Sequence, residues 1–242
     1  MKIDLNCDLG EAAGNDEALM PYITSVNIAC GFHAGNADVM RATVRLAKQF
    51  GVNVGAHPGW NDRQNFGRCG MDVSAEETEA IVLYQIGVLA GIAKAEGVAL
   101  THVKPHGALY NQAAKDRGLA DAIARAIKSF SVDLILVGLA GSGLCEAGVE
   151  AGLKVAGEGF ADRAYNPDGK LMSRNKPGAV IESPEEVAKN ALKLVRYGIL
   201  FGEKIVRVDT LCLHGDHPRA AENAKLLREA LTINGIEVAG LK

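Results

Sequence analysis

A lysine and a histidine stand two positions apart where a predicted strand ends, as Lys104 and His106 in the stretch 98–110. Side chains alternate between the two faces of an extended chain, so these two lie on the same side of it. Pro105 cannot donate a ladder hydrogen bond and Gly107 lets the backbone turn, so the strand should end here. Near carboxylates such as Asp8 or Glu11 the lysine would stay charged and hold an anionic oxygen, whereas a desolvated lysine would become a base or a nucleophile. The sequence leaves both roles open.

Other predicted strands also end in residues that can do chemistry. Five strands have one apolar face and one polar or small face, and the polar faces end at Asp8, His33, His57, Lys104, His106 and His214. Strand ends meet at one mouth in a barrel, so we expect these side chains to converge. Histidines suit acid–base catalysis near neutral pH or metal ligation. A divalent metal site built from Asp8 and two of the histidines stays open, because no HExxH or HxH pattern specifies one.

Short apolar runs alternate with longer helical segments along almost the whole chain. The strand candidates are Lys2–Cys7, Val26–Cys30, Val52–Ala56, Val98–Lys104, Val132–Gly138, Leu153–Gly157 and Val206–Leu213. This alternation predicts a mainly parallel sheet covered by helices. An open doubly wound sheet fits the pattern too, but polar residues at nearly all the strand ends favour a barrel. We therefore predict an α/β fold, a distorted (β/α) barrel of about seven strands that residues 1–242 form as a single domain.

Several helices have recognisable starts. Asparagine and serine side chains can accept hydrogen bonds from the free N–H groups of a first helical turn, and proline fits the first helical position. A glycine such as Gly51 can end a helix in the left-handed conformation. The predicted helix starts are Asn36, Ser74, Ser183-Pro184 and His217-Pro218.

Composition narrows the class of protein. Of the 242 residues, 48% are hydrophobic and 23% are charged, which is ordinary for a soluble domain. The net charge of −3, without a basic run, gives no support for a nucleic-acid or membrane surface. The five cysteines are scattered without a CxxC pair, and no stretch reaches about 18 uninterrupted apolar residues. We expect a cytoplasmic protein with no nucleic-acid or membrane partner.

Six sequence blocks at the strand ends carry a resemblance to a known family. They are DLNCDLGE at 4–11, NIACGFHAGN at 27–36, GAHPGWND at 55–62, VKPHGALYN at 103–111, EGFADRAY at 158–165 and LCLHGD at 211–216. In this order and spacing the chain resembles the LamB/YcsF family along essentially its whole length. The resemblance implies a distorted barrel of the glycoside hydrolase/deacetylase type.

The resemblance also implies an activity and partners. It implies ATP-dependent opening of the lactam of 5-oxo-L-proline to L-glutamate, as part of a bacterial 5-oxoprolinase, together with two further subunits, B and C. ATP would then be a cosubstrate. The glycine-rich segment 138–143 lacks the Gly-Lys-Ser/Thr ending of a Walker A loop. The sequence therefore leaves open whether ATP binds to this chain or to a partner subunit.

Chemistry assigns roles to the residues at the mouth. We hypothesise a catalytic set in which the lysine stabilises an oxyanion and the histidines transfer protons, namely Lys104, His106, Asp8, His57 and His214. The predicted substrate-binding residues are Asn6, His33, Asp62, Arg63, Glu158 and Arg163. Among them, an arginine can bind a substrate carboxylate through two hydrogen bonds. Two alternatives remain. One is a stand-alone metal-dependent amidohydrolase or deacetylase, and the other is a non-catalytic substrate-binding subunit.

Overall fold

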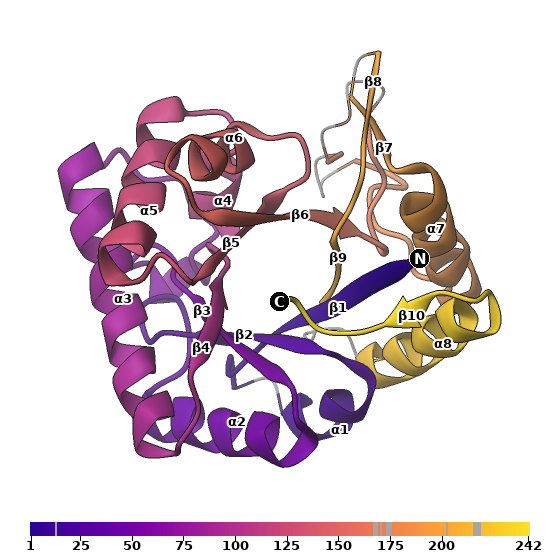
Figure 1. The fold of residues 1–242 in the computed structure, drawn as a ribbon, viewed down its shortest axis with the longest axis horizontal. Helices are drawn as coiled ribbons and strands as arrows, with labels where there is room; N and C mark the ends of the chain where they lie inside the picture. Colours follow the sequence, from indigo (N-terminus) through magenta and orange to yellow (C-terminus); the bar gives the residue numbers. More distant parts are fainter. Residues whose placement is uncertain (13, 167–168, 170, 173–175, 202, 215–218) are drawn as a thin grey trace.

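Seven parallel strands close into a barrel in the computed structural model of the chain (Figure 1). The structure describes residues 1–12, 14–166, 169, 171–172, 176–201, 203–214 and 219–242, without the side chains of 201 and 214. The barrel strands are β1 (Lys2–Leu9), β2 (Ser25–Ala29), β3 (Asn53–His57), β4 (Leu100–Val103), β5 (Ile135–Leu139), β6 (Lys154–Phe160) and β9 (Thr210–His214). They pair in the order β1-β2-β3-β4-β5-β6-β9, and β9 pairs again with β1. The predicted barrel of about seven strands is confirmed.

Helices surround this barrel, as Figure 1 shows. They are α1 (Asp16–Leu19), α2 (Ala37–Phe50), α3 (Ala75–Ala95), α4 (Gly107–Ala113), α5 (Arg117–Phe130), α6 (Gly143–Glu150), α7 (Pro184–Tyr197) and α8 (Ala220–Ile233). Two short 3₁₀ helices are η1 (Met20–Tyr22) and η2 (Arg63–Asn65). Outside the barrel, β7 (Ile199–Phe201) and β8 (Lys204–Val206) form an antiparallel hairpin, and β10 (Glu237–Val238) pairs with the start of β1.

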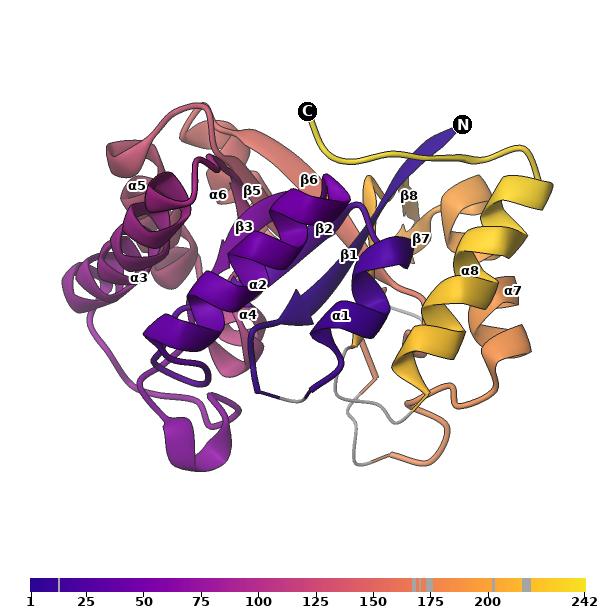
Figure 2. The same cartoon turned by 90° about the horizontal axis from the view of Figure 1, so that it is seen from below.

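Both chain termini lie at one end of the barrel, at the top of Figure 2. Strand β1 starts beside the N-terminus and runs toward the opposite end, and the other barrel strands are parallel to it. The carboxyl ends of the barrel strands therefore all lie at the end of the barrel opposite the chain termini. The loops that follow the strands surround a mouth there, as the functional side of such a barrel requires.

Local sequence accounts for the helix ends. The Asn36 side chain accepts a hydrogen bond of 2.9 Å from a first-turn N–H of α2, and that helix ends at Gly51 with φ of 67°. Ser74 caps α3 and Ser183 caps α7 in the same way. The predicted starts at these three residues are confirmed. The predicted start at His217-Pro218 lies outside the described residues.

Three predicted strands are wrong in their bounds. Strand β5 begins three residues after the predicted start at Val132, and β6 continues three residues past the predicted end at Gly157. The third, Val206–Leu213, joins parts of two separate strands. Val206 ends β8 of the hairpin, and the barrel strand β9 begins only at Thr210. The chain bends between them at Asp209, whose carboxylate accepts a hydrogen bond of 2.8 Å from the Gly157 N–H. This polar anchor directs the chain into the barrel, and an apolar pattern alone does not indicate it.

The polar faces of the strands point into the barrel, as the alternation predicts. Asn27 on β2 donates to Asn6 on β1 at 2.7 Å, and His102 on β4 donates to Asn27 Oδ1 at 2.8 Å. Lys104 directly follows β4, and its Nζ donates to Asn6 Oδ1 at 3.2 Å. Strands β1 and β4 are not neighbours in the sheet, so this contact must cross the interior. The opposite faces carry apolar residues such as Leu5 that belong to the core beneath the helices.

Among the described residues, α3 alone is long and apolar enough to cross a membrane by length and composition. Its buried residues include Val82, Ile86, Leu89 and Ala93, which recur at helical spacing. The helix packs on α5 and β3, which the outer helix of a barrel must do with an apolar face. The buried face of α3 therefore accounts for these four apolar residues.

A missing side chain at Gly55 in β3 makes room for His102 in β4. A Cβ at position 55 would lie 2.1 Å from His102 Nε2, far inside van der Waals contact. We predict that Gly55→Ala lowers the free energy of unfolding by about 1–3 kcal/mol, the usual cost of overpacking. Urea denaturation followed by circular dichroism measures it.

The matched control for this substitution is Gly87→Ala in α3. A Cβ at Gly87 meets nothing within 4 Å, and alanine stabilises a helix interior by about 0.5–1 kcal/mol relative to glycine. The two variants should therefore change stability in opposite directions. Equal unfolding midpoints would contradict the role given to Gly55.

Candidate active site

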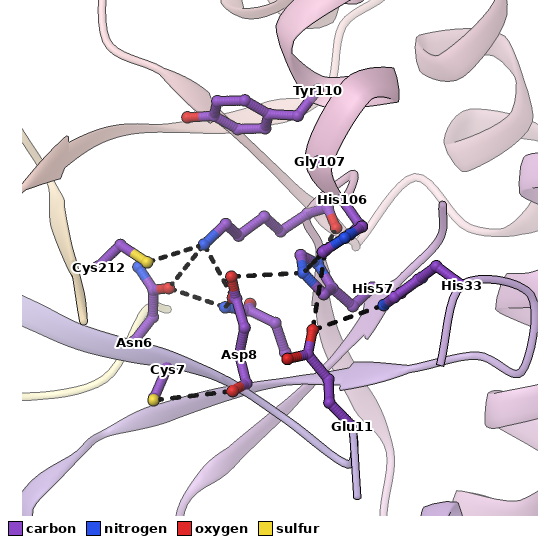
Figure 3. A network of polar contacts seen from close by, with 12 residues as sticks. Asn6, Cys7, Asp8, Glu11, His33, His57, His106, Gly107, Tyr110 and Cys212 are labelled. Atoms are coloured by element: carbon purple, nitrogen blue, oxygen red, sulfur yellow. Dashed lines mark hydrogen bonds and ion pairs between the residues drawn. The ribbon is translucent and has the colours of Figure 1, made fainter. Parts of the chain in front are cut away.

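A buried lysine is the centre of the candidate site. The Lys104 side chain is 3% exposed, and its Nζ lies 2.9 Å from Asp8 Oδ1 and 2.8 Å from Glu158 Oε1. Nζ also donates to Asn6 Oδ1 at 3.2 Å and to Cys212 Sγ at 3.1 Å. These partners come from β1, β6 and β9, so several strands meet at one ammonium group. Figure 3 labels three of these partners, Asn6, Asp8 and Cys212.

The carboxylates decide the protonation state of this lysine. Burial alone would lower the pKa of Lys104, because a charged group loses hydration inside a protein. The negative charges of Asp8 and Glu158 outweigh that effect and hold the pKa well above its usual value. Lys104 is therefore an ammonium. Of the two roles left open by the sequence, this favours charge stabilisation over action as a base or a nucleophile.

Glu158 and Asn6, both predicted to bind substrate, hold the lysine in place. Glu158 is fully buried, and it accepts hydrogen bonds from Tyr110 Oη at 2.7 Å and from Asn6 Nδ2 at 2.9 Å. Asn6 is also buried and donates to Thr210 Oγ1 at 2.7 Å. These contacts fix the direction of the Lys104 side chain. Contact of either residue with substrate stays a prediction.

The hydroxyl of Tyr110 provides a test of this arrangement. Tyr110→Phe keeps the ring but leaves a buried oxygen of Glu158 without one of its donors, which costs about 1–3 kcal/mol. We predict that loss in the free energy of unfolding, measured by urea denaturation. Tyr84→Phe is the control because Tyr84 is 58% exposed, and it should change stability by less than about 0.5 kcal/mol. A Tyr110→Phe protein as stable as the wild type would show that Glu158 does not need this donor.

A second group of polar residues lies beside the lysine and is called the histidine cluster: Glu11, His33, His57 and His106. The rings of His33 and His106 stack with centroids 3.8 Å apart and planes 3° apart, and His57 meets His106 edge-on. Glu11 Oε1 lies 3.6 Å from His33 Nε2 and 3.8 Å from His106 Nδ1 (Figure 3). The ends of β1, β2, β3 and β4, with the loops that follow them, therefore each supply one ligand-type side chain.

Asp8 joins the lysine to the histidine cluster. Its Oδ1 accepts from Lys104 Nζ and from Asn27 Nδ2, and its Oδ2 lies 3.4 Å from His57 Nε2. Four residues of the predicted catalytic set are thus close together, namely Asp8, His57, Lys104 and His106. The side chain of the fifth, His214, lies outside the described residues.

Glycines in the loop after β3 and at the start of α4 leave space around the stacked histidines. Gly67 has φ of 63°, and a Cβ there would lie 2.8 Å from His33 Cβ. A Cβ at Gly59 would lie 2.6 Å from His33 Nδ1. Gly107 has φ of 50°, and its Cβ would lie 2.7 Å from the Gly67 oxygen. A side chain at any of these three positions would displace the rings or the loop that holds them.

Burial keeps the stacked imidazoles neutral. Desolvation, together with the neighbouring His57, lowers the pKa of His106 to about 3. Desolvation and the other two rings also place the pKa of His33 far below its usual range. Neutral rings have an unprotonated nitrogen with a lone pair. The histidine cluster offers one ligand atom per residue, all within 4.8 Å of one another, and so could hold a metal ion.

A cavity of about 220 Å³ opens beside the histidine cluster. Its lining includes Glu11, His33, Asn36, Arg63 and Phe66. The Arg63 guanidinium donates to the Gly35 oxygen at 2.7 Å, and Asp62 accepts a hydrogen bond from the Asn65 N–H in η2. Both residues thus shape the loops at the mouth, and their contact with substrate stays a prediction.

Arg163 lies in the segment between β6 and α7. It is 7% exposed, and its guanidinium donates to the backbone oxygens of Met172 at 2.6 Å and Ala179 at 3.3 Å. These contacts hold the segment together. The predicted grip of Arg163 on a substrate carboxylate stays a prediction.

Two residues of the site were not found from the sequence in their present role. Glu11 was expected near Lys104, and it lies against His33 and His106. Tyr110 was not singled out. Its place could have been inferred from the spacing of four residues between His106 and Tyr110. Residues four apart lie on the same face of a helix, and α4 starts at Gly107. Strand alternation ends before this helix and does not detect it.

Comparisons with known proteins agree with one another. The model of the LamB/YcsF family matches residues 3–242. A protein of Pyrococcus abyssi, named as the A subunit of 5-oxoprolinase, is 53% identical over 100% of this chain and 98% of its own length. A protein of Methylococcus capsulatus with the same name is 55% identical over 99% of this chain and 95% of its own length.

Solved structures give the same picture. The crystal structure of the lactam utilization protein from Thermus thermophilus has a TM-score of 0.93 at 48% identity and covers 100% of both chains. The T48 deacetylase with substrate has a TM-score of 0.52 at 13% identity, covering 99% of this chain and 87% of its own. This second likeness concerns the fold alone, and it agrees with the predicted barrel of the deacetylase type.

Proposed function

Because the chain belongs to the LamB/YcsF family, we propose that it acts as the A subunit of an ATP-dependent 5-oxoprolinase. Its relatives in Pyrococcus abyssi and Methylococcus capsulatus bear that name and match nearly the whole chain. The similar Thermus protein is named for lactam utilization, which fits a cyclic amide as substrate. The substrate would be 5-oxo-L-proline and the product L-glutamate.

The observation that carries this proposal is the buried Lys104 ammonium beside the histidine cluster. Opening the activated lactam and hydrolysing the acyl phosphate pass through tetrahedral species in which an oxygen on the reacting carbon gains negative charge. A fixed positive charge stabilises such an oxyanion more strongly in a buried site than in water. Asp8 would orient the lysine and His57, since it contacts both. His57, His106 or His214 would carry protons between water and the ring nitrogen.

ATP makes the chemistry feasible, because a five-membered lactam is a poor electrophile. The amide oxygen would attack the γ-phosphorus of ATP, and ADP would leave. Water would add to the activated carbon, the C–N bond would break with protonation of the nitrogen, and γ-glutamyl phosphate would form. A second water would release phosphate and L-glutamate. One ATP and two waters are thus consumed for each ring opened.

Partner subunits complete the proposal. The relatives are named as the A subunit, which supports the proposal that this chain is one component of a larger enzyme. Its partners would be the B and C subunits. The chain has no Walker A ending, so we place the ATP site on a partner or at a shared surface. The five free cysteines suit a reducing compartment, and we propose a cytoplasmic location.

The histidine cluster favours one second candidate, a metal-dependent amidohydrolase that works without ATP or partners. Its four ligand-type atoms, all within 4.8 Å of one another, are the observation behind it. The two candidates differ in whether ATP is needed. The purified chain, alone and with the B and C subunits, is assayed for glutamate formed from 5-oxoproline with and without ATP. We expect glutamate only from the full complex with ATP, and glutamate from the chain alone would favour the amidohydrolase.

Lys104→Met provides the sharper test, because it removes the charge and keeps most of the side-chain volume. We predict that kcat of the reconstituted complex falls by about 100-fold or more, the usual effect of losing an oxyanion-stabilising group. Single-turnover and steady-state glutamate assays measure it.

Lys94→Met is the matched control, since Lys94 is an exposed lysine in the last turn of α3. It should leave kcat unchanged. Co-purification with the B and C subunits shows that both variants assemble. An assembled Lys104→Met complex with full turnover would refute the role of this lysine.

A further inference from the structure

His57 and His106 point ring nitrogens at each other, with Nε2 of His57 3.0 Å from Nδ1 of His106. His57 Nδ1 lies 2.6 Å from the Lys104 backbone oxygen, and His106 Nε2 lies 2.8 Å from the Phe66 oxygen. A carbonyl oxygen only accepts, so both nitrogens must carry the N–H. A neutral imidazole has one N–H. In that form His57 Nε2 and His106 Nδ1 face each other with lone pairs, and a cation between them would satisfy both.

Two more groups direct electron pairs to the same place. His33 is fully buried, and neither of its ring nitrogens has a hydrogen-bond partner. Buried polar atoms rarely lack a hydrogen-bond partner, and a bound ion would explain why the ring nitrogens of His33 have none. His33 Nε2 is 3.6 Å from Glu11 Oε1, which is 3.8 Å from His106 Nδ1. Three imidazoles and one carboxylate thus converge.

We infer that Glu11, His33, His57 and His106 bind one divalent transition-metal ion of the Zn²⁺ class. Imidazole and carboxylate are typical ligands of this class, whereas Mg²⁺ and Ca²⁺ prefer oxygen alone. Two ligands of a tetrahedral ion with bonds of 2.0–2.1 Å lie about 3.3 Å apart. The separations of 3.0, 3.6 and 3.8 Å in the cluster bracket that value.

The surroundings of the cluster fit a metal site. Metal-binding histidines usually donate their other N–H to a backbone oxygen or a carboxylate, as His57 and His106 do here. The cavity lined by Glu11 and His33 gives a small ligand access from the mouth. The role of the ion in lactam opening rests on the proposed function. When bound, it would act as a Lewis acid toward a carbonyl oxygen or a water.

The test measures metal on this chain alone, without ATP or partner subunits, so it is independent of the proposed reaction. Protein treated with a chelator is loaded with Co²⁺, passed through a desalting column and analysed for metal content and visible absorption. We expect one Co²⁺ per chain, with the intense d–d bands of a four- or five-coordinate site that Zn²⁺ displaces. A folded wild-type chain that retains no Co²⁺ would overturn the inference.

Variants identify the ligands. Glu11→Gln and His57→Ala should each weaken Co²⁺ binding by at least about 10-fold and shift its absorption bands. Glu11→Gln keeps the side-chain size, and circular dichroism confirms that each variant is folded. Wild-type affinity and spectrum in both would overturn the assignment.

Two controls exclude other binding sites. His102→Gln removes a buried histidine that bonds Asn27 inside the barrel, and Cys69→Ser removes an exposed thiol. Both should keep the wild-type affinity and spectrum. Loss of the Co²⁺ signal in folded Cys69→Ser would move the site to that thiol and also overturn the inference.

Discussion

One ammonium group buried inside the barrel balances two carboxylates that come from distant parts of the chain. Asp8 lies at the end of β1 and Glu158 in β6, and both contact the nitrogen of Lys104. Removing one partner of such a buried pair typically costs about 3–5 kcal/mol, because a charge is left without compensation. The register of at least three strands is therefore tied to this contact. The same balance keeps the lysine charged, so the stability of the barrel and the electrostatics of its mouth depend on one interaction.

The histidine cluster is organised in the opposite way. The lysine half of the site contains its own cation, whereas in the cluster three imidazole rings and a carboxylate face one another. Its shape depends on space rather than on charge pairing, since Gly59 and Gly67 leave volume that the rings fill and Gly107 lets the Gly67 backbone come close. Asp8 touches both halves and holds them next to each other. An anionic oxygen bound at the mouth would meet positive charge on one side and electron-pair donors on the other.

The sequence predicted much of this architecture for a simple reason. Strand alternation fixes which side chains share a face, so the inward direction of Asn6, His102 and Lys104 followed once a barrel was inferred. Alternation stops where the strand stops. The place of Glu11 depends on the path of a loop, and the contact of Tyr110 depends on a helix that begins after the strand. Full burial of Glu158 also could not be read from its neighbours, because its three donors come from other segments.

Lys104 contributes to the site twice, through different atoms. Its ammonium balances the carboxylates, and its backbone oxygen accepts the N–H that sets the tautomer of His57. Only the first contribution belongs to the side chain. Substitution at this position can therefore change the charge of the site while the imidazole stays oriented. In evolutionary terms a change in the electrostatics of the mouth at this position carries a cost in stability, whereas the orientation of His57 is protected by the polypeptide backbone itself.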